Sequence, residues 1–96
     1  MIRHICMFKL KEENKEEVLV EILKRTKALN EISSTTGGVT VTNSKKAPNS
    51  NYDFCLIYDF KDIEGLNAYQ NDPIHLACKD YFMEYITNRA CIDYEY

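Results

Sequence analysis

Residues 52–60, with the sequence YDFCLIYDF, decide the fold. The even-numbered positions of this stretch hold aromatic residues and a leucine, whereas the odd-numbered positions hold two aspartates, a cysteine and an isoleucine. Strict alternation of this kind is typical of a β-strand, because successive side chains point to opposite faces of a sheet. We therefore expect a strand here, with one apolar face and one mixed face.

Three more strands are predicted outward from this stretch. Residues 2–9 alternate in the same way, but both of their faces are apolar: Ile2, His4, Cys6 and Phe8 lie on one, and Ile5 and Met7 on the other. Residues 39–43 and 90–96 are the other two predicted strands. The polar run 44–51 has no apolar period, which indicates an exposed loop between antiparallel strands.

Helices are predicted in the intervals between these strands. After the charged residues 11–17, apolar positions recur at intervals of three and four, which indicates an amphipathic helix. Its buried stripe comprises Val18, Leu19, Ile22, Leu23, Thr26, Leu29 and Ile32. Asp62 is a suitable N-cap for a short helix to about residue 71. Asp72 and Pro73 begin a further helix, which we expect to run to about residue 88.

The predicted element order is βαββαβ with a split second helix, in a single domain of residues 1–96. This is the order of a ferredoxin-like α+β fold, in which helices cover one face of a four-stranded antiparallel sheet. The other face would display an apolar patch that includes Ile5, Met7, Cys55 and Ile57. Monomers rarely expose such a patch, so we predict that a second copy covers it in a homodimer.

The composition argues against several classes of function. The 96 residues carry a formal net charge of −3 without a dense lysine or arginine block, so nucleic acid is not an expected partner. No segment approaches the ~18 consecutive apolar residues of a membrane span, and the start does not form a signal peptide, so a cytoplasmic protein is expected. Cys6, Cys55, Cys78 and Cys91 are widely spaced, and we expect four reduced thiols.

Four segments of the chain resemble the stress-responsive A/B barrel (Dabb) domain family. They are residues 2–11 (IRHICMFKLK), residues 52–56 (YDFCL), residues 69–75 (YQNDPIH) and the pair Asp93-Tyr94. The most specific is the run aromatic-x-x-x-Pro-x-His, supported by the histidine of the first strand. The resemblance covers nearly the whole chain. It implies that two sheets join across a two-fold axis into an eight-stranded dimeric α/β barrel.

One plant member of this family is a polyketide cyclase, which closes its product by an intramolecular aldol reaction without a metal or cofactor. The resemblance maps its catalytic tyrosine and histidine onto Tyr69 and His75, and a further pocket histidine onto His4. The chain departs from that enzyme at Phe54, where the cyclase has another histidine, and at Thr26, where it has a tyrosine. The identity of the substrate therefore does not carry over.

The residues themselves place His75 in the first turn of its helix, on the apolar stripe that continues through Cys78, Phe82 and Ile86. Burial and the helix N-terminus both favour a neutral imidazole, which could act as a general base. Tyr69 is expected to be half-buried, with a hydroxyl that could stabilise charge on a carbonyl oxygen. Both residues also have a structural interpretation, in which they pack in the core and bond to the backbone.

His4 is expected to face the same cleft, and Tyr52, Phe54 and Tyr58 are further candidates to line it for ligand binding. No third ligand accompanies the two histidines, so we expect no metal. The resemblance to the cyclase implies that no other cofactor is needed. We predict a cleft for a small hydrophobic or aromatic ligand and acid-base chemistry on a small carbonyl or polyketide-like compound. The alternatives are a non-catalytic ligand-binding or stress-protective dimer and, by analogy of fold, a cofactor-free monooxygenase.

Overall fold

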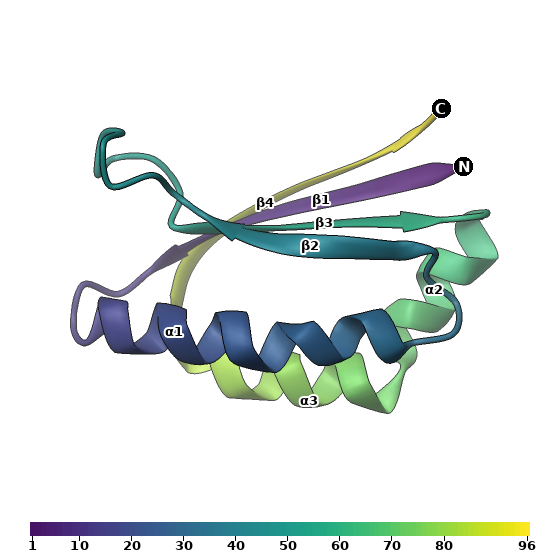
Figure 1. Ribbon diagram of the computed structural model, residues 1–96, viewed down its shortest axis with the longest axis horizontal. Helices are drawn as coiled ribbons and strands as arrows, with labels where there is room; N and C mark the ends of the chain where they lie inside the picture. The colour runs from purple at the N-terminus through teal and green to yellow at the C-terminus, as the bar shows by residue number, and fades with distance from the viewer.

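A computed structural model describes all residues from Met1 to Tyr96. Its elements are β1 (Ile2–Leu10), α1 (Lys15–Thr26), the 3-10 helix η1 (Lys27–Glu31), β2 (Gly37–Thr42), β3 (Phe54–Phe60), α2 (Ile63–Asn71), α3 (Pro73–Phe82), the 3-10 helix η2 (Met83–Tyr85) and β4 (Ile86–Glu95). The strands form one layer, and the α-helices all lie on one side of it (Figure 1). No helix has the length and apolarity needed to cross a membrane.

The four strands form one antiparallel sheet in the order β2-β3-β1-β4. This arrangement confirms the predicted α+β fold. In the register of the central pair, Cys6 of β1 opposes Leu56 of β3, and Phe8 opposes Phe54. Because opposed residues share a face, the even-numbered side chains of both strands enter the core beneath the helices.

The core lies between the sheet and the helices, and three aromatic rings connect its layers. Phe8 stacks on Phe54 with 4.7 Å between the ring centroids, and Phe82 of α3 meets both rings edge-on. Full burial of one such side chain stabilises the fold by ~1.5–3 kcal/mol. The aromatic cluster therefore holds α3 against the centre of the sheet.

Strand β2 approaches β3 closely because it carries Gly38. A Cβ atom at this position would collide with the carbonyl oxygen of Ile57 and with the ring of Tyr58. That ring is buried, and its hydroxyl donates a hydrogen bond of 3.3 Å to the carbonyl oxygen of Thr26. The absent side chain at Gly38 leaves the space in which Tyr58 lies.

The helix that begins at Asp72 ends six residues earlier than predicted. Asp72 caps it as expected, because its carboxylate accepts a hydrogen bond of 2.9 Å from the Ile74 N–H. The helix nevertheless ends at Phe82, and Ile86 belongs to β4, where it pairs with Leu10 of β1. Pairing with β1 outweighs the helical period here, and β-branched Ile86 favours the strand.

Two further boundaries also differ from the prediction. The helical stripe predicted through residue 32 is divided, because α1 ends at Thr26 and the chain continues as η1. Strand β3 begins at Phe54 rather than at residue 52, because Asp53 is buried and belongs to a bend. Its carboxylate accepts a hydrogen bond of 2.7 Å from the Leu10 N–H and lies 3.2 Å from the ammonium of Lys15.

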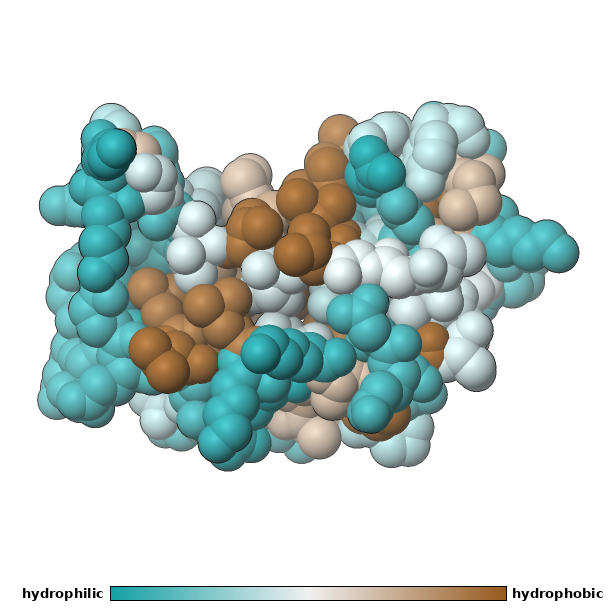
Figure 2. Space-filling model, in the orientation of Figure 1, coloured by the Kyte–Doolittle hydropathy of each residue, from teal (hydrophilic) through white to brown (hydrophobic).

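We call the face of the sheet that the helices leave uncovered the outer face. Its apolar residues are Ile5, Met7, Val39, Val41, Cys55, Ile57, Ala90 and Ile92. Within it, the exposed fractions reach 50% at Val39 and 61% at Ile92. Figure 2 shows part of this face in profile, as a cluster of apolar side chains over β2.

Candidate functional site

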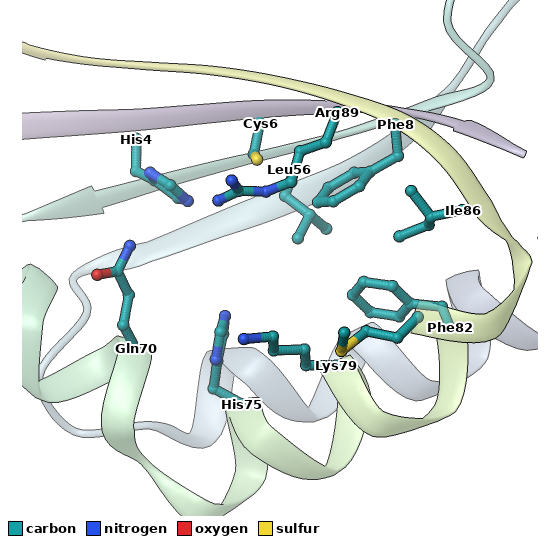
Figure 3. Close-up of a pocket in the computed structure, with 11 residues that line it drawn as sticks. His4, Cys6, Phe8, Leu56, Gln70, His75, Lys79, Phe82, Ile86 and Arg89 are labelled. Atoms are coloured by element: carbon teal, nitrogen blue, oxygen red, sulfur yellow. The ribbon is translucent and has the colours of Figure 1, made fainter.

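A cavity of about 530 Å³ opens between the sheet and the helices α2 and α3. Its roof comes mainly from β1 and β4, and its floor comes from α3 with the end of α2 (Figure 3). The lining residues are His4, Cys6, Phe8, Leu56, Gln70, His75, Lys79, Phe82, Met83, Ile86 and Arg89. The volume falls in the range of ~300–1,000 Å³ that is typical of small-molecule sites.

The lining is divided into two parts. The polar end comprises His4, Gln70, His75, Lys79 and Arg89, and the apolar end comprises Phe8, Leu56, Phe82 and Ile86. In Figure 3 the side chains of the polar end point toward one another across the open space. A few convergent polar groups beside an apolar wall are typical of sites for small organic molecules.

His75 reaches the polar end because Asp72 and Pro73 start α3 just before it. Burial lowers the pKa of His75, and the neighbouring side chains of His4 and Lys79 act in the same direction. The imidazole is therefore neutral at pH 7. Its Nδ1 atom is buried and makes no hydrogen bond of ordinary geometry, although the backbone of Gln70 lies close enough to favour the protonated ring.

Tyr69 lies behind the cavity wall and is fully buried, rather than half-buried as predicted. Its ring centroid is 4.7 Å from that of His75 and 6.4 Å from that of His4, so it packs near both imidazoles. The hydroxyl has no hydrogen-bond partner, and burial raises the pKa of the phenol. Tyr69 therefore stays protonated and retains an unused donor.

His4 projects into the cavity from β1 and is paired with Asp93 of β4. The two residues are direct partners in the strand register. Since the carboxylate accepts the hydrogen of Nδ1, the other ring nitrogen, Nε2, is left as an acceptor. Asp93 thus fixes both the orientation and the tautomer of His4.

The aromatic residues predicted to bind a ligand lie elsewhere. Phe54 and Tyr58 are buried core residues and do not line the cavity. Tyr52 precedes β3 and borders a separate depression beside Met7 and Val41. The structure therefore brings together His4, His75 and Tyr69, and leaves Tyr52, Phe54 and Tyr58 outside the cavity.

The sequence interpretation did not identify three polar lining residues, namely Gln70, Lys79 and Arg89. Lys79 follows His75 by four positions, so the helical period would have placed it on the same face. Arg89 alternates with Cys91 and Asp93 along β4. Its position could be found only once the register of that strand was known.

The cavity wall also includes a disulfide. Cys6 of β1 and Cys91 of β4 are register partners and are bonded to each other, whereas Cys55 and Cys78 are free. The prediction of four reduced thiols is therefore wrong for this pair. Spacing along the chain does not reveal two cysteines that are separated by 85 residues and adjacent only in the sheet.

The family model of the stress responsive A/B barrel domain matches residues 2–96. The chain belongs to this family. A search of curated protein sequences returns no match.

Solved structures give the same fold for this A/B barrel domain. A dimeric protein of unknown function from Bacteroides fragilis is 26% identical, with a TM-score of 0.89 over 99% of this chain and 95% of that chain. A Dabb family protein from Mesorhizobium loti is 24% identical, with a TM-score of 0.76 over 99% and 95% of the two chains. The hydroxynitrile lyase of Passiflora edulis is 13% identical, with a TM-score of 0.78 over 97% and 90%.

Proposed function

We propose that this A/B barrel domain is a homodimeric enzyme that uses no cofactor and moves protons on a small carbonyl compound. The observation that carries the proposal is the presence of two imidazoles, His4 and His75, at one end of one cavity. Tyr69 is buried next to both rings with an unused hydroxyl. Paired groups that can accept and donate protons are what general acid-base catalysis requires.

In this proposal, His75 is the general base. Its neutral ring accepts a proton from the carbon next to the substrate carbonyl. The electron pair of that C–H bond forms a C=C bond with the carbonyl carbon, and the π pair of the carbonyl moves to its oxygen. The enolate oxygen can accept a hydrogen bond from the side-chain amide of Gln70, which also lines the polar end. Tyr69 is a positioning residue, because it packs on His75 from behind the wall and does not line the cavity.

His4 has a second role in the proposed reaction. The carboxylate of Asp93 holds its Nδ1–H, so Nε2 is free to accept a hydrogen bond from a hydroxyl or enol group of the substrate. The two imidazoles therefore approach the substrate from different elements, β1 and α3. The hydroxynitrile lyase of Passiflora edulis, which has the same fold, is an enzyme, and this is consistent with the proposal.

The outer face supports the homodimer. It is apolar and exposed, and the protein from Bacteroides fragilis that shares this fold is dimeric. Each Å² of apolar surface that is buried stabilises the associated state by about 25 cal/mol, so association of two such faces is favourable. We propose that the two sheets pack through them.

The test measures proton abstraction from carbon without requiring the natural substrate. In D₂O, the α-hydrogens of 4-phenyl-2-butanone exchange for deuterium, and ¹H NMR follows the loss of signal. We expect the protein to accelerate exchange by at least ~100-fold over imidazole buffer of matched concentration, as general-base catalysis does. His75→Gln should abolish the acceleration, and Lys46→Gln in an exposed loop should leave it unchanged.

Exchange at the buffer rate would reject the proposed chemistry. If the ketone then binds without exchange, the non-catalytic ligand-binding dimer becomes the better interpretation. Oxygen uptake with a hydroquinone would instead favour the monooxygenase. Tyr69→Phe distinguishes positioning from contact, because a positioning residue should change the pH profile of exchange while leaving the affinity for the ketone intact.

A further inference from the structure

The charges around the cavity differ from those of the chain as a whole. The sequence has 15 acidic and 12 basic side chains, yet the only Asp, Glu, Lys or Arg residues that line the cavity are Lys79 and Arg89. Neither side chain takes part in an ion pair or a side-chain hydrogen bond within the protein. The cavity of an acidic protein therefore has two unpaired cations in its wall.

These two cations come from opposite walls. Arg89 descends from β4 in the roof, and Lys79 extends from α3 along the floor toward His75, so both side chains border the same space (Figure 3). Both residues are exposed, so water can reach their side chains. One anion held between them would gain charge-assisted hydrogen bonds from both sides.

The rest of the lining restricts the kind of anion. Beyond the two cations lies the apolar end, which offers the rings of Phe8 and Phe82 and the side chain of Ile86. Hydrophobic contact there requires an apolar body attached to the anionic group. A planar carboxylate also matches the fork of N–H donors in the Arg89 guanidinium.

We propose that the cavity binds a carboxylic acid with an apolar body, whose carboxylate is held between Arg89 and Lys79. This inference deepens the proposed function, since it names the substrate as a carboxylic acid that also carries a carbonyl group. Only the reaction of this acid depends on the proposed function. The binding of the acid is inferred separately, from the charge and shape of the cavity.

The test compares two ligands of the same shape and different charge. Isothermal titration calorimetry measures the affinity of the protein for 3-phenylpropanoate and for the neutral 3-phenylpropanamide. We expect the acid to bind at least about tenfold more tightly, with a preference that falls as salt is added. Arg89→Gln and Lys79→Gln should each weaken binding of the acid about fivefold or more and leave binding of the amide unchanged.

A charge-matched control is Lys61→Gln, which removes a cation outside the cavity and should not alter either affinity. Equal binding of acid and amide, binding of neither, or a preference that survives loss of both cations would overturn the proposal. Phenyl phosphate that binds more tightly than the acid would also overturn it. His75→Gln separates the two proposals, because it should abolish exchange and leave the preference for the acid intact.

Discussion

His4 and His75 face one cavity but have different hydrogen-bond partners. Nδ1 of His4 donates to Asp93, whereas Nδ1 of His75 is buried without a partner. An unsatisfied buried polar group costs ~1–3 kcal/mol relative to one that is bonded. Such a cost is common where a side chain is retained for its chemistry. The unpaired nitrogen therefore makes His75 the stronger candidate for a functional role.

The lowered pKa of His75 gives a prediction for NMR titration and for stability. The ring should titrate below the ~6.5 of a free imidazole. In the folded protein His75 then binds its proton at lower pH than in the unfolded chain. The contribution of His75 to the free energy of unfolding should therefore be fully present above pH ~6.5. It should be lost progressively as the pH falls from ~6.5 to the folded pKa.

Urea unfolding of the native protein and of His75→Gln, measured in parallel across that range, isolates this contribution. The free energy of unfolding of the variant should depend less on pH. The value for the native protein minus that for the variant should therefore decrease as the pH falls. A His75 that titrates at or above the value of a free imidazole would contradict the argument from burial.

The sequence identified His4 and His75 because each lies within one regular local period. Strand alternation placed His4 on the inner face, and the capped start of α3 placed His75 in a first helical turn. Asp93 and Arg89 depend instead on how β4 pairs with β1, and that register is set by contacts between the two ends of the chain. No local pattern contains this information.

At the scale of elements, the contact between β2 and β3 depends on Gly38. Gly38→Ala introduces a methyl group that meets the Ile57 carbonyl oxygen and the Tyr58 ring. Forcing extra volume into a packed core costs ~1–3 kcal/mol, and we expect a loss of this size in urea unfolding. Thr42→Ala, at the exposed end of the same strand, should cost less than ~0.5 kcal/mol. Equal effects of the two substitutions would refute the role given to Gly38.

The bond between β1 and β4 gives a prediction for the intact mass. Without a reducing agent, the protein should be lighter than its reduced form by two hydrogen atoms, and only Cys55 and Cys78 should react with a maleimide after unfolding. Cys91→Ser should lower the free energy of unfolding by ~2–4 kcal/mol. Cys55→Ser is the control, since this thiol is free. Four reactive thiols in the untreated protein would show that the bond is absent.

The type and order of the elements could be predicted, but the ends of the longer helices could not. The apolar stripe of the helix that starts after Asp72 continues in sequence through Ile86, and nothing local opposes it. The chain leaves the helix at Phe82 because β1 offers Leu10 as a partner for Ile86. Tertiary pairing overrides local periodicity where two elements compete for the same residues.

The whole molecule has one face that its own helices do not cover. Along β1, the side chains of Ile5 and Met7 point away from the helices, and their register partners on the neighbouring strands are also apolar. A soluble monomer does not usually leave so continuous an apolar patch in water. The two-faced pattern of β1 predicted this face from the sequence alone, because both of its sets of alternate residues are apolar.

A charge on the outer face should prevent the proposed association. Ile57→Asp places a carboxylate where a second sheet would exclude water, and an unpaired buried charge is strongly unfavourable. Sedimentation of the native protein at micromolar concentration should give twice the chain mass, and the variant should sediment as a monomer. Val20→Asp is the matched control, because Val20 is 68% exposed on α1, away from this face. A native protein that sediments at the mass of a single chain would contradict the proposed dimeric barrel.

Strand β4 contributes alternate residues to the proposed ligand cavity and to the proposed homodimer interface. Arg89, Cys91 and Asp93 point toward the cavity side, and Ala90 and Ile92 point toward the outer face. For directed evolution, this places two separately selectable traits on one strand of ten residues. A library that varies only Arg89 and its neighbours on the cavity side would explore new ligands while the surface that recognises the second copy stays constant.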